Sequence, residues 1–298
     1  MMENVLSITN AVPNDLFESL DVSESTRREY RFYSQQFITF LSGRQFGVDS
    51  FIEYKRYLAS RNDLSVSSKN KYLTTARILL KELNRRGLLP MDITQNIKSF
   101  KQSRRHKRTG LNNDEISRLL KAVHELPKAK STYRLKAILS LMILQGLRQC
   151  EIVRLDVSDV DLVHGLLFVR GKGCDDVEAV YMHPESVIAV RKYLKHTRIA
   201  DGALFVSWSN NNRNQRITTK SLRHMVKDTL MALKIPKTVH GFRHFFTTTL
   251  LKEYGGDLLQ VARYTRHKSL SMLQVYDDSI KEEADLPRYY QAFQKITL

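Results

Sequence analysis

A strongly basic stretch divides this chain of 298 residues into two parts. It contains six basic residues and no acidic one: Lys98, Lys101, Arg104, Arg105, Lys107 and Arg108. The stretch lies between two regions of helical periodicity, and in water its charges repel one another, so it is typical of a linker that follows a phosphate backbone. A flexible, protease-sensitive hinge is the alternative. We predict domains at 1–101 and 111–285, a linker at 102–110 and a C-terminal tail at 286–298.

The part before the linker, from about residue 15, has the pattern of a small helical bundle. Three apolar stripes recur at helical spacing, with many aromatic residues: Tyr30, Tyr33, Phe37, Phe40 and Leu41; Phe51, Ile52, Tyr54, Tyr57 and Leu58; Tyr72, Ala76, Leu79, Leu80 and Leu83. Gly87 and Pro90 end the third stripe. We expect these aromatic rings to form a core rather than a surface on which bases stack.

Basic residues accompany the first and third stripes on the faces predicted to point outward. They are Arg27, Arg28, Arg31, Lys69, Lys71, Arg77 and Lys81. A bundle that grips a DNA duplex would carry its charge in this way. For any single one of these residues, a solvated helix face explains the charge equally well.

Beyond the linker the pattern is again mainly helical. Apolar residues at helical spacing from Leu135 onward predict a helix that Gly146 ends, so that Arg148 lies at a helix terminus. Glu151 follows three residues later, where it can brace the guanidinium or cap the next turn. His240 and Arg243 share one helix face because they are three residues apart.

Further helices and one hairpin are expected in this part. Asn113 is predicted to cap a helix that runs through Val123, and Thr218 to cap one that runs through Leu233. The strand-like runs 166–170 and 177–182 flank Gly-Lys-Gly at 171–173, which predicts a β-hairpin with Lys172 at its tip. Ala203 to Val206 is a weaker candidate for extended structure. The predicted fold class is therefore mainly α, with a helical N-terminal bundle and a mostly helical second domain that contains a small β-hairpin or sheet.

The polar groups of the second domain suit an attack on phosphorus. The guanidiniums of Arg148 and Arg243 match the oxygens of a phosphodiester. Tyr276 can act as nucleophile if an imidazole takes its proton or a cationic pocket favours the phenolate, because a phenol has a pKa near ~10. Lys172 can protonate the leaving oxygen if neighbours lower its pKa. Any one of these residues alone is more often a solvated residue, a DNA-backbone contact, a cap or part of a core; their order, with Tyr276 nine residues after His267, argues against coincidence.

With these motifs the chain resembles the tyrosine recombinase (phage integrase) family over nearly its whole length. The resemblance implies that Tyr276 forms a covalent 3′-phosphotyrosyl bond with DNA and that Arg148 and Arg243 clamp the phosphate. It also implies the remaining roles: general base for His240, general acid for Lys172, a hydrogen bond to the phosphate for His267 and support of the first arginine for Glu151. The N-terminal bundle would be a core-binding domain that clamps one side of the DNA.

The sequence departs from the family pattern at two places. Thr265-Arg266 precedes His267 where the family often has Leu-Gly, and Cys150 stands where a serine is common. Neither departure removes a reacting group. We interpret Arg266 as a surface residue rather than as an additional phosphate contact.

The composition favours a polyanionic partner. The chain has 48 basic and 31 acidic residues, a net charge of +17, which predicts salt-sensitive binding to nucleic acid.

No secretory signal or apolar run of membrane-spanning length occurs, so we expect a cytoplasmic protein with no membrane association. Two cysteines, Cys150 and Cys174, lack zinc-ligand spacing, and we expect no metal and no other cofactor.

The function that these observations favour is site-specific recombination of double-stranded DNA by transesterification, without ATP or a metal. Because each active site cuts one DNA strand, a complete exchange requires four active sites, which predicts a homotetramer on DNA. Accessory proteins are compatible with this function. A type IB topoisomerase and a catalytically inactive DNA-binding regulator are the alternatives. The last stretch carries four apolar residues that are expected to pack against another surface: Tyr289, Tyr290, Phe293 and Ile296. The resemblance implies that this surface belongs to a neighbouring subunit, and docking within the chain is the alternative.

Overall fold

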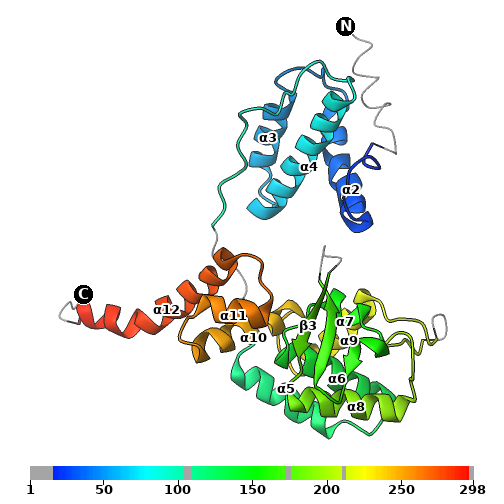
Figure 1. Ribbon diagram of the computed structural model, residues 1–298. Coiled ribbons are helices and arrows are strands. Elements are labelled where there is room, and N and C mark those ends of the chain that lie inside the picture. Colours follow the sequence, from blue (N-terminus) through cyan, green and yellow to red (C-terminus); the bar gives the residue numbers. More distant parts are fainter. Residues whose placement is uncertain (1–15, 104–108, 172–175, 210–212, 295–298) are drawn as a thin grey trace. The chain divides into compact units, whose positions relative to one another are not determined.

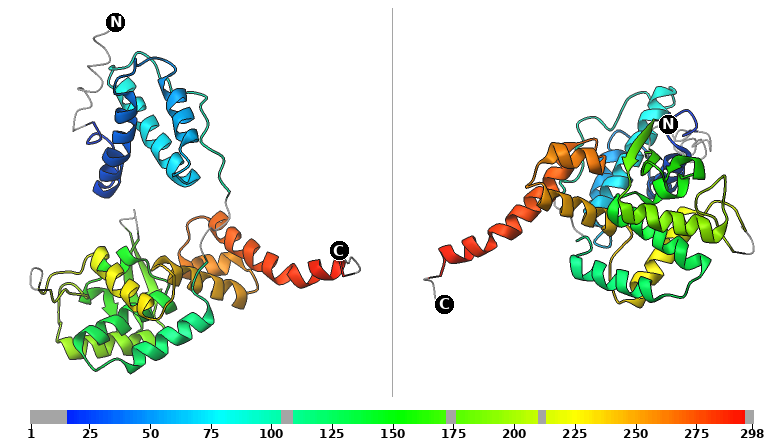
Figure 2. Two further views of the ribbon diagram at one scale, coloured as in Figure 1. Left: turned by 180° about the vertical axis from the view of Figure 1, so that it is seen from behind. Right: turned by 60° about the horizontal axis from the view of Figure 1, so that its bottom comes forward.

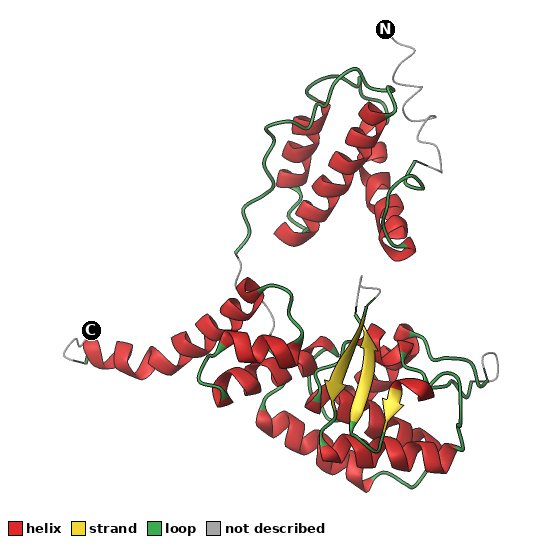
Figure 3. Ribbon diagram, viewed as in Figure 1, coloured by secondary structure: helices red, strands yellow, loops and turns green. Residues whose placement is uncertain are grey.

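The computed structural model describes residues 16–103, 109–171, 176–209 and 213–294. The chain forms two compact units, residues 1–103 and 104–298. Both units are built mostly of helices, and the second contains one small sheet (Figures 1 and 3). The predicted mainly α fold class is confirmed.

The first unit is a helical bundle of α2 (Glu24–Leu41), α3 (Ser50–Ser60) and α4 (Val66–Arg85). Ser23 and Ser65 cap α2 and α4, because each hydroxyl accepts a hydrogen bond from the backbone N–H three residues later. Phe37, Phe51 and Tyr54 are at most 1% exposed and lie at the centre of the core. The predicted aromatic core is confirmed at these positions.

Several basic residues predicted to face outward bind groups of the unit itself, among them Arg27, Arg77 and also Lys69, which donates to the Ala59 carbonyl at 2.8 Å. Arg27 donates to the backbone carbonyls of Phe17 and Leu20. Arg77 lies over the ring of Phe51 and donates to the Ile97 carbonyl at 2.6 Å. The outward orientation predicted for Arg27 and Arg77 is therefore wrong, because their long side chains satisfy carbonyls that the bundle leaves without a helical partner.

The second unit contains the remaining elements. They are α5 (Asn113–Glu125), α6 (Lys130–Leu144), α7 (Gln149–Arg154), η1 (Val157–Asp159), β1 (Val160–Asp161), β2 (Leu166–Arg170), β3 (Val177–Tyr181), α8 (Pro184–Thr197), α9 (Thr219–Ala232), α10 (His240–Glu253), α11 (Leu258–Thr265) and α12 (Leu270–Ala292). Helix α6 is central: it packs against α8, α9 and α10, and Ile138, Leu141 and Met142 on it are almost fully buried.

The sheet has the order β1-β2-β3 with antiparallel neighbours. Arg170 pairs with Val177, so β2 and β3 form the predicted hairpin, while its connection at 172–175 lies outside the described residues. Strand β1 was not predicted because two residues carry no periodic signal. Ala203 and Val206 form only isolated bridges, so the extended segment predicted there is not a strand.

Two predicted helix starts can be compared with the observed caps. Asn112, not Asn113, caps α5: its side chain accepts from the Glu115 N–H at 2.8 Å, and the Glu115 carboxylate accepts from the Asn112 N–H at 2.9 Å. Thr218 caps α9 as predicted and accepts from the Ser221 N–H.

The C-terminal segment is a continuation of α12 rather than a separate element. The helix runs without a break across residue 286, and both views in Figure 2 show its last turns leaving the rest of the second unit. Tyr289, Tyr290 and Phe293 are 57%, 62% and 51% exposed. None of the helices in the described part of the chain has the length and apolar character needed to span a membrane.

Candidate active site

The turn between α6 and α7 places Arg148. Helix α6 ends at Leu144, and Gly146 has a φ of +59°, a conformation that side chains rarely adopt. A Cβ at Gly146 would also lie 2.3 Å from the Phe246 ring. Arg148 then becomes the N-cap residue of α7, at the helix terminus that the sequence predicted.

Glu151 holds Arg148 from the first turn of α7. Its side chain is fully buried, Oε1 accepts from Arg148 Nη1 at 2.6 Å, and Oε2 accepts from the Arg148 backbone N–H at 2.8 Å. The carboxylate therefore both braces the guanidinium and caps the helix, the two roles that the spacing allowed.

A second guanidinium reaches the same carboxylate. Arg266 Nη2 donates to Glu151 Oε2 at 2.7 Å, and only 8% of the Arg266 side chain is exposed. The interpretation of Arg266 as a surface residue is therefore wrong. Burial raises the pKa of Glu151, but the nearby charge of Arg266 and the hydrogen bonds from Arg148 outweigh it, so the pKa lies below its ordinary value.

Arg243 joins the segments that flank the site. It is 3% exposed, donates through Nη1 to the Gly146 carbonyl at 2.7 Å, and donates through Nη2 to the Thr265 carbonyl. Burial and then the charge of Arg148 lower its pKa from the ordinary value of an arginine to about 10. Arg243 thus remains a cation at neutral pH and ties the turn before Arg148 to the turn before His267.

His267 follows α11 directly and is partly buried. Its Nδ1 lies 2.7 Å from the Thr265 hydroxyl, and that hydroxyl donates to the Val261 carbonyl at 2.8 Å. Since the hydroxyl proton is used, Nδ1 is the donor of this pair and Nε2 carries the lone pair. Burial, then Arg243 and Arg148, lower the pKa of His267 from 6.5 to about 4, so the imidazole is neutral at pH 7.

Tyr276 lies on the second turn of α12 and is 4% exposed. Its ring packs with Leu251, Val261 and Leu273, and the His244 ring lies against it in an edge-on arrangement with centroids 4.7 Å apart. The His267 centroid is 6.4 Å away. Burial raises the pKa of Tyr276 although Arg243 opposes this, so the phenol is protonated at neutral pH.

His240 and Lys172 are the two remaining candidate residues. His240 is exposed at the first residue of α10, three positions before Arg243, and its charge is one of the causes that lower the pKa of His267. Lys172 lies outside the described residues.

The structure brings together an excess of positive charge in a largely buried place. The guanidiniums of Arg148, Arg243 and Arg266 surround one buried carboxylate, that of Glu151. Such an arrangement favours binding of an anion. Within the described part of the chain, no group of His, Cys, Asp and Glu side chains could hold a metal ion.

Sequence reasoning missed three contributions to this site. Thr265 orients His267, His244 packs on Tyr276, and Arg266 shares Glu151 with Arg148. The unusual Thr265-Arg266 pair was the available signal for two of them. His244 gave no signal beyond its position one residue after Arg243.

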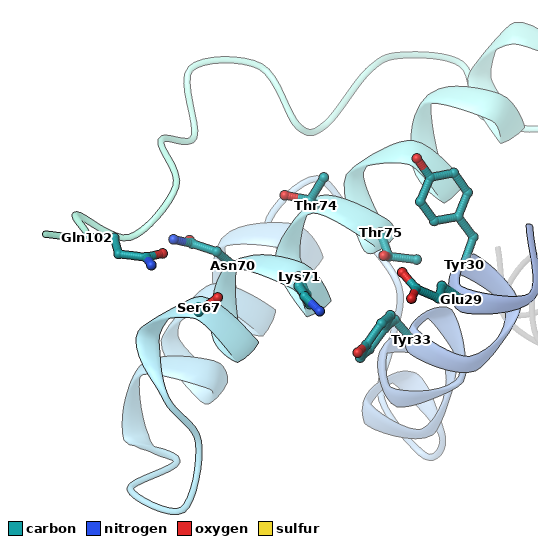
Figure 4. Close-up of a pocket in the computed structure, with 9 residues that line it drawn as sticks. All are labelled: Glu29, Tyr30, Tyr33, Ser67, Asn70, Lys71, Thr74, Thr75 and Gln102. Atoms are coloured by element: carbon teal, nitrogen blue, oxygen red, sulfur yellow. The ribbon is translucent and has the colours of Figure 1, made fainter. Parts of the chain in front are cut away.

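The candidate DNA contacts of the first unit and linker are only partly described. Arg28, Lys71, Lys98 and Lys101 are exposed and Lys69 is half-buried, while Arg104, Arg105, Lys107 and Arg108 lie outside the described residues. A groove of about 280 Å³ between α2 and α4 is lined by polar residues that include Glu29 and Lys71 (Figure 4). Tyr33 forms one wall of the groove, with the Lys71 ammonium 5.7 Å from its ring centre.

Comparison with known proteins gives consistent matches. A model of the phage integrase family matches residues 110–283. Tyrosine recombinase XerD of Yersinia pestis is 30% identical, covering 75% of this chain and 76% of that protein. Tyrosine recombinase XerC of Leptospira interrogans is 27% identical, covering 77% and 73%. The crystal structure of the XerH site-specific recombinase in a post-cleavage complex with its difH substrate superimposes with a TM-score of 0.76 at 18% identity, covering 96% of this chain and 87% of that one.

Proposed function

This chain belongs to the phage integrase family of tyrosine recombinases, and we propose that it exchanges DNA strands at specific sites through a covalent intermediate with Tyr276. The observation that carries the proposal is the contact pattern of Arg243. It binds the carbonyls of Gly146 and Thr265, and so joins the segments of Arg148 and His267 beside the α12 helix of Tyr276. Tyr276 is near the same groups, because its ring centroid lies 6.4 Å from that of His267 and the charge of Arg243 acts on its pKa.

The first step is attack of the Tyr276 oxygen on the phosphorus. His240 accepts the phenol proton, the bond from phosphorus to the 5′ oxygen breaks, and Lys172 protonates that oxygen. Arg148 and Arg243 stabilise the negative charge that gathers on the non-bridging oxygens. In other enzymes a metal ion supplies this stabilisation. The 5′-hydroxyl of a second strand then attacks the phosphotyrosyl bond, which retains the energy of the original diester, so that no ATP is needed.

His267 has a role that depends on its protonation. Its Nδ1–H is engaged by Thr265, so only Nε2 can face the phosphate, and Nε2 can donate only after it gains a proton. An arriving phosphate anion favours the imidazolium. We therefore expect His267 to take up a proton when DNA binds and then to donate to a non-bridging oxygen.

The assembly follows from the chemistry. One site cuts one strand, so a complete exchange requires four copies on two double-stranded DNA sites. The exposed rings at the end of α12 suit docking on a neighbouring copy. The exposed basic residues of the first unit and linker, such as Arg28, Lys71 and Lys98, would contact the phosphate backbone. The reaction takes place on DNA in the cytoplasm, and accessory proteins are compatible with it.

A covalent adduct tests the proposal. The protein is incubated with fragments of genomic DNA and denatured, and the DNA that stays attached is sequenced. We expect the wild type to form the adduct and Tyr276→Phe to lose it while it still binds DNA. Tyr181→Phe, at a tyrosine that is 78% exposed, is the matched control and should behave as the wild type.

The alternatives predict different outcomes. A wild type that binds DNA and never forms the adduct would be a regulator. Products that only rejoin the original strand would identify a topoisomerase, whereas joints between two different DNA molecules identify a recombinase.

A further inference from the structure

We propose that Arg266 is a positioning residue, which acts through Glu151 to fix the Arg148 guanidinium and connects it to strand β3. The inference rests on the proposed function, because it deepens the account of the same site. Its basis is one set of contacts around a buried carboxylate.

Glu151 is the centre of these contacts. Its fully buried carboxylate receives three donors: Arg148 Nη1, the Arg148 backbone N–H and Arg266 Nη2, at 2.6, 2.8 and 2.7 Å. A buried carboxylate is costly unless it is fully paired. With Arg148 as its only cation, Glu151 would direct all of its negative charge at that guanidinium and weaken its attraction for a phosphate. The second guanidinium shares the negative charge, and Arg148 keeps positive charge for a phosphate.

The remaining nitrogens of Arg266 show why it acts indirectly. Nε lies 3.5 Å from the carboxylate of Glu178 on β3, the strand that follows the segment of Lys172. Nη1 is buried from solvent and has no hydrogen-bond partner among the described residues. The two nitrogens that have described partners, Nη2 and Nε, both face carboxylates. Arg266 therefore connects α7, β3 and the end of α11 rather than contacting the DNA.

The backbone conformation at Arg266 allows a substitution that removes the side chain without strain. Arg266 caps α11 with φ 55° and ψ 43°, a left-handed conformation that glycine adopts without cost. A residue with a side chain adopts this conformation only at a cost in free energy. The ion pairs with Glu151 and Glu178 offset this cost.

The chain contains a matched control at Arg198. Arg198 caps α8 with φ 58° and ψ 31°, and its N–H binds the carbonyl four residues earlier at 2.8 Å, as the N–H of Arg266 does. Arg198 is exposed and lies on a different helix. Replacement of either arginine by glycine therefore relieves the same backbone conformation, but only Arg266→Gly removes a partner of Glu151.

The test measures the rate of adduct formation at saturating DNA, using DNA recovered from the wild-type adduct. We expect Arg266→Gly to lower the rate roughly 10- to 100-fold, the cost of a misplaced catalytic group, with DNA affinity unchanged. Arg198→Gly should match the wild type. Arg266→Lys should recover part of the rate, because one ammonium can pair with Glu151 but cannot also reach Glu178.

A double-mutant cycle with Glu151→Gln decides how Arg266 acts. If Arg266 works through Glu151, Arg266→Gly lowers the rate by less than about threefold once the carboxylate is gone. An equal loss in both backgrounds would overturn the proposal in favour of direct phosphate contact. A parallel loss of rate and DNA affinity would overturn it in favour of a purely structural role.

Failure of the positioning role and failure of the proposed function give different results. If the wild type forms the adduct and Arg266→Gly is unaffected, only the positioning role falls. If the wild type forms no adduct, the proposed function falls and the positioning role falls with it.

Discussion

At the scale of single residues, the site depends on shared hydrogen-bond partners. Thr265 contributes its carbonyl to Arg243 and its hydroxyl to His267, and Glu151 contributes one carboxylate to Arg148 and Arg266. Each shared partner fixes two functional side chains at once. Loss of one such partner should therefore affect more than one step of the reaction.

The imidazole of His267 makes stability depend on pH. Its pKa is about 4 in the folded protein and ordinarily 6.5, so between these values the unfolded chain binds a proton that the folded chain does not. Stability must then fall as the pH decreases from 6.5 toward 4. The lowered pKa of Glu151 adds to this loss only below its ordinary value of 4.5.

We predict that His267→Gln flattens the fall in unfolding free energy between pH 6.5 and 4.5. Urea unfolding at each pH measures the slope, and His224→Gln, at an exposed histidine of α9, is the control that should keep it. Identical slopes in the two variants would contradict the assignment of the low pKa to His267.

At the scale of elements, short turns at the ends of helices position Arg148 and His267. Arg148 follows the turn after α6, and His267 follows the left-handed cap of α11. Arg243 closes both turns by binding their carbonyls. A change in one of these turns should therefore reach the chemistry through Arg243.

Gly146 provides the test for these turns. We predict that Gly146→Ala lowers the free energy of unfolding by about 2 to 4 kcal/mol, because the left-handed φ costs about 1 and the collision with Phe246 adds about 1 to 3. Gly202→Ala should cost only about 1 kcal/mol, since Gly202 has a φ of +66° but nothing within 4 Å of the added Cβ. Equal losses in urea unfolding would show that the packing against Phe246 is unimportant.

At the scale of the whole molecule, the net charge and the exposed end of α12 are the features that favour association with other molecules. The net charge of +17 favours a polyanion without choosing a sequence. Tyr289, Tyr290 and Phe293 present apolar area that the described part of the second unit leaves exposed. Their burial against another copy would stabilise an assembly on DNA.

We predict that deletion of residues 286–298 prevents assembly of the tetramer on paired DNA sites but leaves adduct formation at a single site. Sedimentation of the protein–DNA complexes measures the first property and denaturing gels the second. A truncated protein that unfolds at a markedly lower temperature yet still assembles would show that the tail docks within its own subunit.

The sequence alone was sufficient for the elements with long, regular patterns. The stripes of α2, α3 and α4, the helix that ends before Gly146, and the pair of strands around Lys172 were all predicted, because apolar periodicity and turn residues act locally. The two-residue strand β1 gave no such pattern, and the cap of α5 lies one residue earlier than expected.

Only the tertiary structure decided which charged side chains are buried. Arg27, Arg77 and Arg266 look alike in the sequence, and each was assigned to the surface. Folding gave them carbonyl or carboxylate partners that lie 10 positions away for Arg27, 20 for Arg77 and 115 for Arg266. The types of the site residues and their order along the chain were sufficient to predict the chemistry of the site. The pairing of its charges depends on contacts between separate segments, and local sequence patterns do not predict such contacts.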